Sequence, residues 1–182
     1  MTRKNRKRLV IDANIASSAG TSEVPASFYS RTCLDTILRD EHVAVFSRAL
    51  RQEWRKHASS HARQWQASME QHRRIEDEEG DEFAYLLDRA CACLEYAAWQ
   101  DALRKDFHLV QSSLATGQIL LSNESKLPGH LTTCCNSVPA FRKLFFANPE
   151  KEKDACIQWI KAGAKKDPHR RIDQWSRRQA AD

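Results

Sequence analysis

The sequence predicts an α/β fold in which a central, mostly parallel sheet is flanked by helices. The first observation is the segment 105–124, which combines a helical pattern, a closing Gly117 and an apolar run at 119–121. The second is the run 8–14, whose apolar and β-branched residues end in a carboxylate, as central parallel strands often do. The third is the alternation of strand and helix patterns near the N-terminus, which favours parallel pairing.

The next elements follow from hydrophobic spacing. Apolar residues recur at helical spacing over 26–39, and 42–46 forms a second short strand. Ser47 is a suitable N-cap for a helix that begins at Arg48. The alternation is therefore strand, helix, strand, helix.

A helical hairpin is expected at about 58–104. The helix from Arg48 continues to Arg74 in this interpretation, and an acidic turn at 76–82 separates it from an amphipathic helix over 82–104. The acidic turn is either solvated or a metal site, and the first is the commoner case for such a loop. The hairpin would be inserted between Glu53 and Asp106.

The patterns after Glu124 are weaker. We expect 126–139 to be mostly irregular, 143–147 to form a strand and 150–162 to form a closing helix. Residues 1–162 would then make up one domain, and 163–182 a mobile basic tail.

Composition fits a globular protein. With 182 residues, 41% apolar and 29% charged, the chain can bury a core in one domain. No apolar stretch approaches the roughly 18 residues needed to span a bilayer, and the N-terminus lacks the apolar region of a signal peptide. We therefore expect a cytoplasmic protein with no membrane partner. Its six cysteines lack CxxC pairs and are expected to be small core residues.

The net charge of +5 is concentrated at the two ends of the chain. Residues 1–8 carry five basic side chains and no acid, and 163–182 carry six against three acids. Clustered Lys and Arg are typical of nucleic-acid binding, because each neutralised phosphate releases counterions. A merely solvated terminus has the same composition, so both interpretations stay open.

Four carboxylates are predicted to meet at the carboxyl edge of the sheet, where ligands bind in open α/β folds. Asp12 and Glu124 end strand patterns, Asp106 opens the helix that leads to the second of these strands, and Glu53 lies on the helix after the second strand. Four carboxylates in one place repel each other unless a cation balances them. Oxygen ligands select Mg²⁺ or Mn²⁺, which can activate water for phosphodiester cleavage. The pattern predicts a metal-dependent nuclease.

The chain resembles the PIN domain family over roughly residues 8–147. The likeness is carried by Val10-Ile11-Asp12-Ala13-Asn14, by Glu53, and by the spacing from Asp106 through Gly117 to Ser122-Asn123-Glu124. The resemblance implies a three-layer fold and a Mg²⁺- or Mn²⁺-dependent endoribonuclease that leaves a 5′-phosphate and a 3′-hydroxyl. Glu124 departs from the family's usual Asp, and the long hairpin and the basic tail are additional.

The resemblance also implies roles for individual residues and partners. Asp12, Asp106 and Glu124 would hold the metal, and Glu53 would be a ligand or would orient the attacking water. The polar residues Asn14, Ser122 and Asn123 would bind substrate or support the site. RNA is the expected substrate. A toxin of this family would have an antitoxin-like inhibitory protein as partner, and members often form homo-oligomers.

Other functions and other site residues remain open. The main alternative is a non-catalytic PIN-like scaffold that binds RNA or a protein through its basic ends and hairpin. Asp101 is a secondary candidate for the acidic cluster, and His57 and His61 have the spacing of a zinc pair on one helix. Trp175, among basic residues, is a candidate for base stacking.

Overall fold

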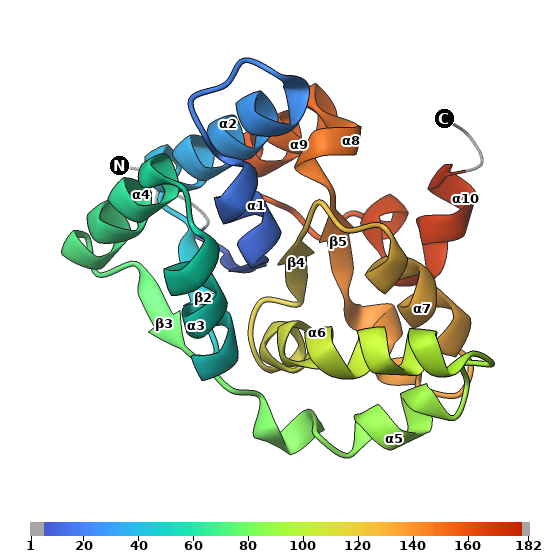
Figure 1. The fold of residues 1–182 in the computed structure, drawn as a ribbon. Helices are drawn as coiled ribbons and strands as arrows, with labels where there is room; N and C mark the ends of the chain where they lie inside the picture. Colours follow the sequence, from blue (N-terminus) through green and yellow to red (C-terminus); the bar gives the residue numbers. More distant parts are fainter. Residues whose placement is uncertain (1–5, 180–182) are drawn as a thin grey trace.

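The protein, seen in a computed structural model that describes residues 6–179, is built on a five-stranded parallel sheet (Figure 1). Its strands are β1 (Arg8–Ile11), β2 (Val43–Phe46), β3 (Ile75–Asp77), β4 (Ile119–Leu121) and β5 (Phe145–Ala147). The order across the sheet is β3-β2-β1-β4-β5, and every neighbouring pair is parallel. The chain therefore adds strands on one side of β1 and then on the other. The reversal lies between β1 and β4, which is where ligands bind in such sheets.

Helices cover both faces of the sheet and give three layers, which confirms the predicted α/β fold class (Figure 1). One group that packs together is α1 (Ala13–Ser18), α2 (Pro25–Arg39), α4 (Ser60–Gln71), α8 (Pro149–Glu152) and α9 (Asp154–Lys161). The other is α5 (Leu86–Cys91), α6 (Ala97–Ala115), α7 (Lys126–Cys134) and α10 (Trp175–Gln179). Helix α3 (Arg48–His57) contacts α1, α6 and β2. Within residues 6–179, no helix is long and apolar enough to cross a membrane.

Short 3₁₀ helices connect these elements. They are η1 (Asp81–Phe83), η2 (Pro139–Lys143), η3 (Pro168–Arg170) and η4 (Ile172–Gln174). They complete the turns that bring the longer helices back onto the sheet.

The core strands and the cap of α3 form as predicted. The apolar residues of β1 and β4 are almost fully buried, as expected for parallel strands that are covered on both faces. Ser47 caps α3 by accepting a hydrogen bond from the Leu50 N–H at 3.1 Å. The cysteines are free thiols that pack in or beside the core, as expected: Cys33, Cys91, Cys134, Cys135 and Cys156 are buried, and Cys93 is partly buried.

The predicted hairpin at 58–104 is wrong in its course. Helix α3 stops at His57, and Ser59 caps a separate helix, α4, through the Ala62 N–H at 3.2 Å. The acidic turn then begins with strand β3, which pairs with β2 at the sheet edge. This pairing is between distant residues, and a short charged strand carries no alternating pattern that would reveal it. His57 and His61 consequently lie in different helices rather than on one helix face.

The segment 82–104 is also interrupted. It holds η1, α5 and the first half of α6 rather than one helix. Leu86, Ala90 and Leu94 are buried as the apolar spacing predicted. The chain turns after Leu94, however. The side chain of Gln100 bridges that turn by donating a hydrogen bond to the Leu94 carbonyl at 2.9 Å.

Residues 126–134, expected to be irregular, form helix α7. The helix tolerates Pro128 because it stands in the first turn, where backbone N–H groups have no partner within the helix. Its buried residues, among them Leu127 and Leu131, pack it against the rest of the second helix group.

The C-terminal segment is packed rather than mobile over its described part. Ile172 and Trp175 are buried, and the ring of Trp175 packs edge-on against Phe146 of β5. Glu152 forms ion pairs with Arg170 and Arg178, which fasten the segment to α8. Because Trp175 is buried, it does not stack bases as an exposed residue would. Residues 1–5 and 180–182 lie outside the described residues, and with them Arg3 and Lys4 of the predicted basic N-terminus. Of its other basic side chains, Arg6 pairs with Glu41 at 2.9 Å and Arg8 with Glu76 at 2.6 Å.

Substitution of Gly117 tests the close contact between the α6–β4 turn and β1. A Cβ atom at this position would lie 2.0 Å from the Arg8 carbonyl oxygen, so the backbone would have to move. We expect Gly117→Ala to lower the free energy of unfolding by roughly 2–4 kcal/mol in a urea titration. Gly129→Ala is the control, because a Cβ at Gly129 in α7 has no neighbouring atom within 4 Å. Equal stability of the two variants would contradict the prediction.

Substitution of Trp175 tests whether the C-terminal segment belongs to the core. Trp175→Ala removes a buried ring, so we expect it to lower the free energy of unfolding by about 3–5 kcal/mol. The exposed neighbour Arg177 provides the control variant, Arg177→Ala, with little change. A Trp175→Ala protein as stable as the control would show that the segment contributes little to the fold.

Candidate functional site

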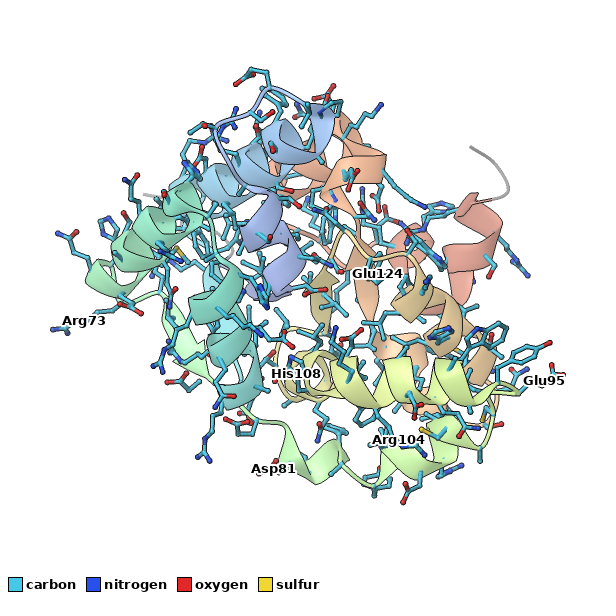
Figure 2. The ribbon with its side chains drawn as sticks, viewed as in Figure 1. Arg73, Asp81, Glu95, Arg104, His108 and Glu124 are labelled. Atoms are coloured by element: carbon cyan, nitrogen blue, oxygen red, sulfur yellow. The ribbon has the colours of Figure 1, made fainter. Side chains whose placement is uncertain are left out.

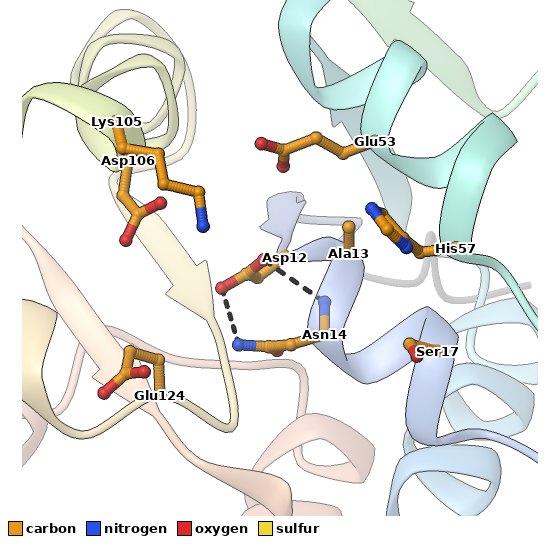
Figure 3. Close-up of a pocket in the computed structure, with 9 residues that line it drawn as sticks. All are labelled: Asp12, Ala13, Asn14, Ser17, Glu53, His57, Lys105, Asp106 and Glu124. Atoms are coloured by element: carbon orange, nitrogen blue, oxygen red, sulfur yellow. Dashed lines mark hydrogen bonds between the residues drawn. The ribbon is translucent and has the colours of Figure 1, made fainter. Parts of the chain in front are cut away.

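A cavity of about 340 Å³ opens at the carboxyl end of β1, beside the point where the strand order reverses (Figure 3). It is lined by residues from five parts of the chain: Asp12, Ala13, Asn14, Ser17, Glu53, His57, Lys105, Asp106 and Glu124. All four carboxylates predicted from the sequence are among them. The fold therefore brings together acids that are more than a hundred residues apart in the sequence.

Asp12 is the most firmly held of the four. Its backbone N–H donates to the Leu121 carbonyl at 2.9 Å, and its side chain caps α1 through the Asn14 N–H. The Oδ2 atom also accepts hydrogen bonds from Ser122 Oγ at 2.6 Å and from Asn14 Nδ2 at 2.8 Å. Asn14 Nδ2 reaches Ser122 Oγ at 2.9 Å as well. We call this group of Asp12, Asn14 and Ser122 the Asp12 network; it joins the end of β1 to the end of β4.

Glu53 is positioned by its neighbour Trp54. The indole of Trp54 is fully buried, donates to the Ile11 carbonyl at 3.0 Å and packs against Phe46. Because Ile11 immediately precedes Asp12, this bond fixes α3 above the end of β1. Glu53 then faces the cavity (Figure 3).

His108 accompanies Glu53 and was not predicted. Its Nε2 atom lies 3.6 Å from Glu53 Oε2, and its Nδ1 atom lies 3.1 Å from the Lys105 carbonyl. The His108 ring lowers the pKa of Glu53 and keeps that carboxylate ionised. Burial opposes the charged form of His108, but Glu53 outweighs it and the pKa of the imidazole is raised. No local pattern in the sequence indicates this pair, because its members lie on different helices.

Asp106 lies in the middle of α6 rather than at its start. The helix begins at Ala97 because the apolar stripe extends further toward the N-terminus, and its buried residues Leu103, Phe107 and Val110 pack it onto the sheet. The strand β4 still follows Gly117, as predicted. Asp101 does not join the cluster; its side chain is 79% exposed and pairs with Arg104 at 3.5 Å.

Glu124 stands at the rim. Its backbone N–H donates to Ser122 Oγ at 2.9 Å, while its carboxylate accepts from the Lys126 N–H at 2.7 Å at the start of α7. Figure 3 shows Glu53 and Glu124 on opposite sides of Asp12. Of the four acids, Glu124 is therefore the one whose carboxylate is least directed to the centre of the cavity.

The carboxylates at the centre of the cavity repel each other when they are ionised. Burial raises the pKa of Asp12, although the hydrogen bonds from Ser122 and Asn14 partly offset it. Burial, followed by the charges of Asp12 and Glu53, raises the pKa of Asp106 to about 6. Lys105 also lines the cavity, and Figure 3 shows its ammonium group between Asp106 and Asp12. The cavity thus has the charge excess that a bound cation would relieve.

The donor chemistry fits a hard divalent cation, but the ligands do not form a closed set. Among residues 6–179, no three His, Cys, Asp or Glu side chains are placed so that they could hold a metal ion together. Mg²⁺ commonly keeps several water ligands and binds through one or two carboxylates. Asp12 and Asp106 are the pair that fits this mode, with Glu53 and Glu124 further out.

Two other predicted substrate residues have structural partners. Asn123 donates from Nδ2 to Ser30 Oγ at 2.9 Å, and its Oδ1 accepts from the Glu150 N–H at 3.4 Å. It lies outside the residues that line the cavity. Ser122 is fully buried in the Asp12 network. Besides His108, the sequence interpretation missed His57, Ser17 and Lys105 as residues of this site.

The raised pKa of Asp106 predicts a pH-dependent gain in stability for Asp106→Asn. Since the folded protein holds this proton up to about pH 6, the free energy of unfolding falls as pH rises from about 4 through 6. Asn carries no charge, so Asp106→Asn should be more stable than wild type at pH 7.5, by roughly 1–2 kcal/mol after allowing for partial exposure. The two should be equally stable at pH 4. Denaturant titrations at both pH values measure this, with the exposed Asp101→Asn as control. A difference that is the same at both pH values would contradict it.

Comparison of the chain with models of protein families, with curated proteins and with solved structures finds no match. Its function is therefore inferred from its own residues and their positions. The resemblance to PIN domains stays a prediction, based on the acids and their spacing.

Proposed function

We propose that the protein is a metal-dependent phosphodiesterase that cleaves RNA. The observation that carries the proposal is the convergence of four carboxylates, from β1, α3, α6 and the loop after β4, on one cavity at the reversal of strand order. A structural role alone would not require Asp12 and Asp106 to be buried close enough to raise the pKa of Asp106. A divalent cation would turn this unfavourable arrangement into a favourable one.

Asp12 and Asp106 would hold Mg²⁺ or Mn²⁺, with Glu124 and Glu53 as further ligands directly or through water. When bound, such an ion supplies an activated water and stabilises the negative charge that develops on phosphoryl oxygens. The Asp12 network leaves Asp12 Oδ1 with a single long contact, from the Asn14 N–H at 3.3 Å, so this oxygen is the better donor to an ion.

The chain's own residues would arrange the substrate around that centre. Glu53, kept ionised beside His108, would accept a hydrogen bond from the attacking water and orient it. Lys105 and His57 line the cavity. Lys105 would contact the phosphate, since its charge offsets the repulsion between a phosphodiester and the acids, and His57 would be a hydrogen-bond partner of the substrate. RNA, rather than DNA, is proposed from the family resemblance.

Loss of Asp12 tests the enzyme reading. We expect wild-type protein to cleave a mixed-sequence single-stranded RNA with Mn²⁺ and not with EDTA, and Asp12→Asn to be at least about a hundredfold slower. Mn²⁺ binding, measured by calorimetry, should weaken in Asp12→Asn and Asp106→Asn. Asp101→Asn, on the same helix as Asp106 but exposed, is the matched control and should behave like wild type.

A non-catalytic PIN-like scaffold is the second candidate. It is favoured by the absence, within residues 6–179, of three ligands in place for a metal, and by the ammonium of Lys105 in the cavity. A folded wild-type protein that neither binds Mn²⁺ nor cleaves RNA in an EDTA-sensitive manner would establish the scaffold and overturn the enzyme proposal. Metal binding without cleavage would instead indicate a narrow RNA target or an inhibitory partner, such as an antitoxin-like protein.

A further inference from the structure

Three aromatic rings contact one another in series at the start of α6 and on α7. Tyr96 and Trp99 have ring centroids 4.6 Å apart and meet edge-to-face, with their planes at 70°. The Trp99 ring centroid lies 5.4 Å from that of His130, with the planes inclined by 30°. Tyr96 and Trp99 are 52% and 42% exposed, whereas His130 is buried. We call these three residues the aromatic stack. Large exposed aromatic side chains held in fixed orientations commonly belong to binding surfaces.

The aromatic stack lies on the side of α6 that leads to the site. Trp99 and Asp106 are seven residues apart in one helix, so they occupy the same face about 10 Å apart along the axis. That distance corresponds to about three stacked base steps of 3.4 Å. His130 is close enough to Glu124 for that carboxylate to act on the His130 pKa. Figure 2 shows Glu124 by the start of α7, with Arg104 along α6 in the direction of Glu95.

Two cations border the route between the aromatic stack and the cavity. Lys105 of α6 and Lys126 at the start of α7 are both exposed, and within the described residues neither side chain has an ion-pair partner. Flat exposed rings followed by free cations form the combination that binds bases and phosphates of a single strand.

We propose that Tyr96 and Trp99 stack on bases of a single-stranded RNA whose phosphodiester lies in the cavity, with Lys105 contacting the phosphate in the cavity and Lys126 contacting an intervening phosphate. This inference rests on the proposed function, because it takes the cavity as the cleavage site. It identifies the substrate as single-stranded and long enough to reach from Asp106 to Trp99. Duplex RNA is excluded as the preferred substrate, since its bases are already stacked and paired.

Binding of a fluorescein-labelled twelve-nucleotide RNA, followed by anisotropy in EDTA, tests the aromatic stack without cleavage. We expect Trp99→Ala and Tyr96→Ala each to weaken binding at least about fivefold, since stacking contributes substantially per base. Trp99→Phe retains a ring and should bind nearly as wild type, which also separates stacking from a folding defect. Tyr85→Ala is the matched control, because Tyr85 is 64% exposed but has no place in the stack.

Salt dependence separates stacking from charge. Trp99→Ala should leave the slope of log affinity against log salt unchanged, because stacking releases no counterions, whereas Lys126→Gln should reduce the slope by about 0.7. A trinucleotide, too short to reach the aromatic stack, should bind wild type and Trp99→Ala equally. A smaller salt slope for Trp99→Ala would overturn the assignment of this residue to base stacking.

The outcomes also separate this inference from the proposed function. If wild type cleaves RNA with Mn²⁺ but Trp99→Ala binds as tightly as wild type, the aromatic stack is not a binding platform and the proposed function stands. If Trp99→Ala loses binding while wild type neither binds Mn²⁺ nor cleaves RNA, the platform stands and the enzyme proposal fails. Absence of RNA binding by wild type would overturn the platform. Self-association that Trp99→Ala abolishes would also overturn it, because the surface would then bind a second copy of the chain.

Discussion

The pairing of β1 with β4 is the constraint on which the rest of the site depends. It places the end of one strand, Asp12, beside the end of the other, Ser122, and the Asp12 network then ties the two together with short hydrogen bonds. Such bonds to a charged group are stronger than those between neutral groups and fix the geometry of the carboxylate. A parallel sheet that reverses its strand order here leaves a crevice between the two strand ends, and the cavity occupies it.

Buried apolar side chains position the charged residues that the helices contribute to this crevice. Trp54 fixes Glu53 by bonding to the residue before Asp12, and the buried stripe around Phe107 fixes Asp106. Asp106 is thereby held where its charge is unfavourable, whereas the charge of Glu53 is compensated by His108. The local excess of negative charge thus lowers the stability of the fold. Such an excess is characteristic of sites that bind cations or act in acid–base chemistry.

The edge strand β3 and the C-terminal segment flank the sheet without entering the centre of this site. Strand β3 extends the sheet on one side, and the C-terminal segment, held by Glu152, Arg170 and Arg178, covers β5 on the other. The region between β3 and β4 also begins α6 well before Asp106, which gives the helix room to carry Trp99, with Tyr96 at its N-cap. The same helix therefore holds an acid of the cavity and the exposed rings, so that the proposed cleavage and base-binding functions share one rigid element.

The sequence by itself determined the central elements and the acids of the site. Hydrophobic spacing located β1, β2, β4 and the capped start of α3, because buried strands and helix caps depend on neighbouring residues in the chain. Strand-end acids at Asp12 and Glu124, with Glu53 and Asp106, were found for the same reason. Only the tertiary structure decided the rest: β3 exists through pairing with β2, Trp175 is buried through contact with Phe146, and Glu53 meets His108 across two helices. These contacts join residues far apart in sequence, where local pattern carries no information about which partner each side chain meets.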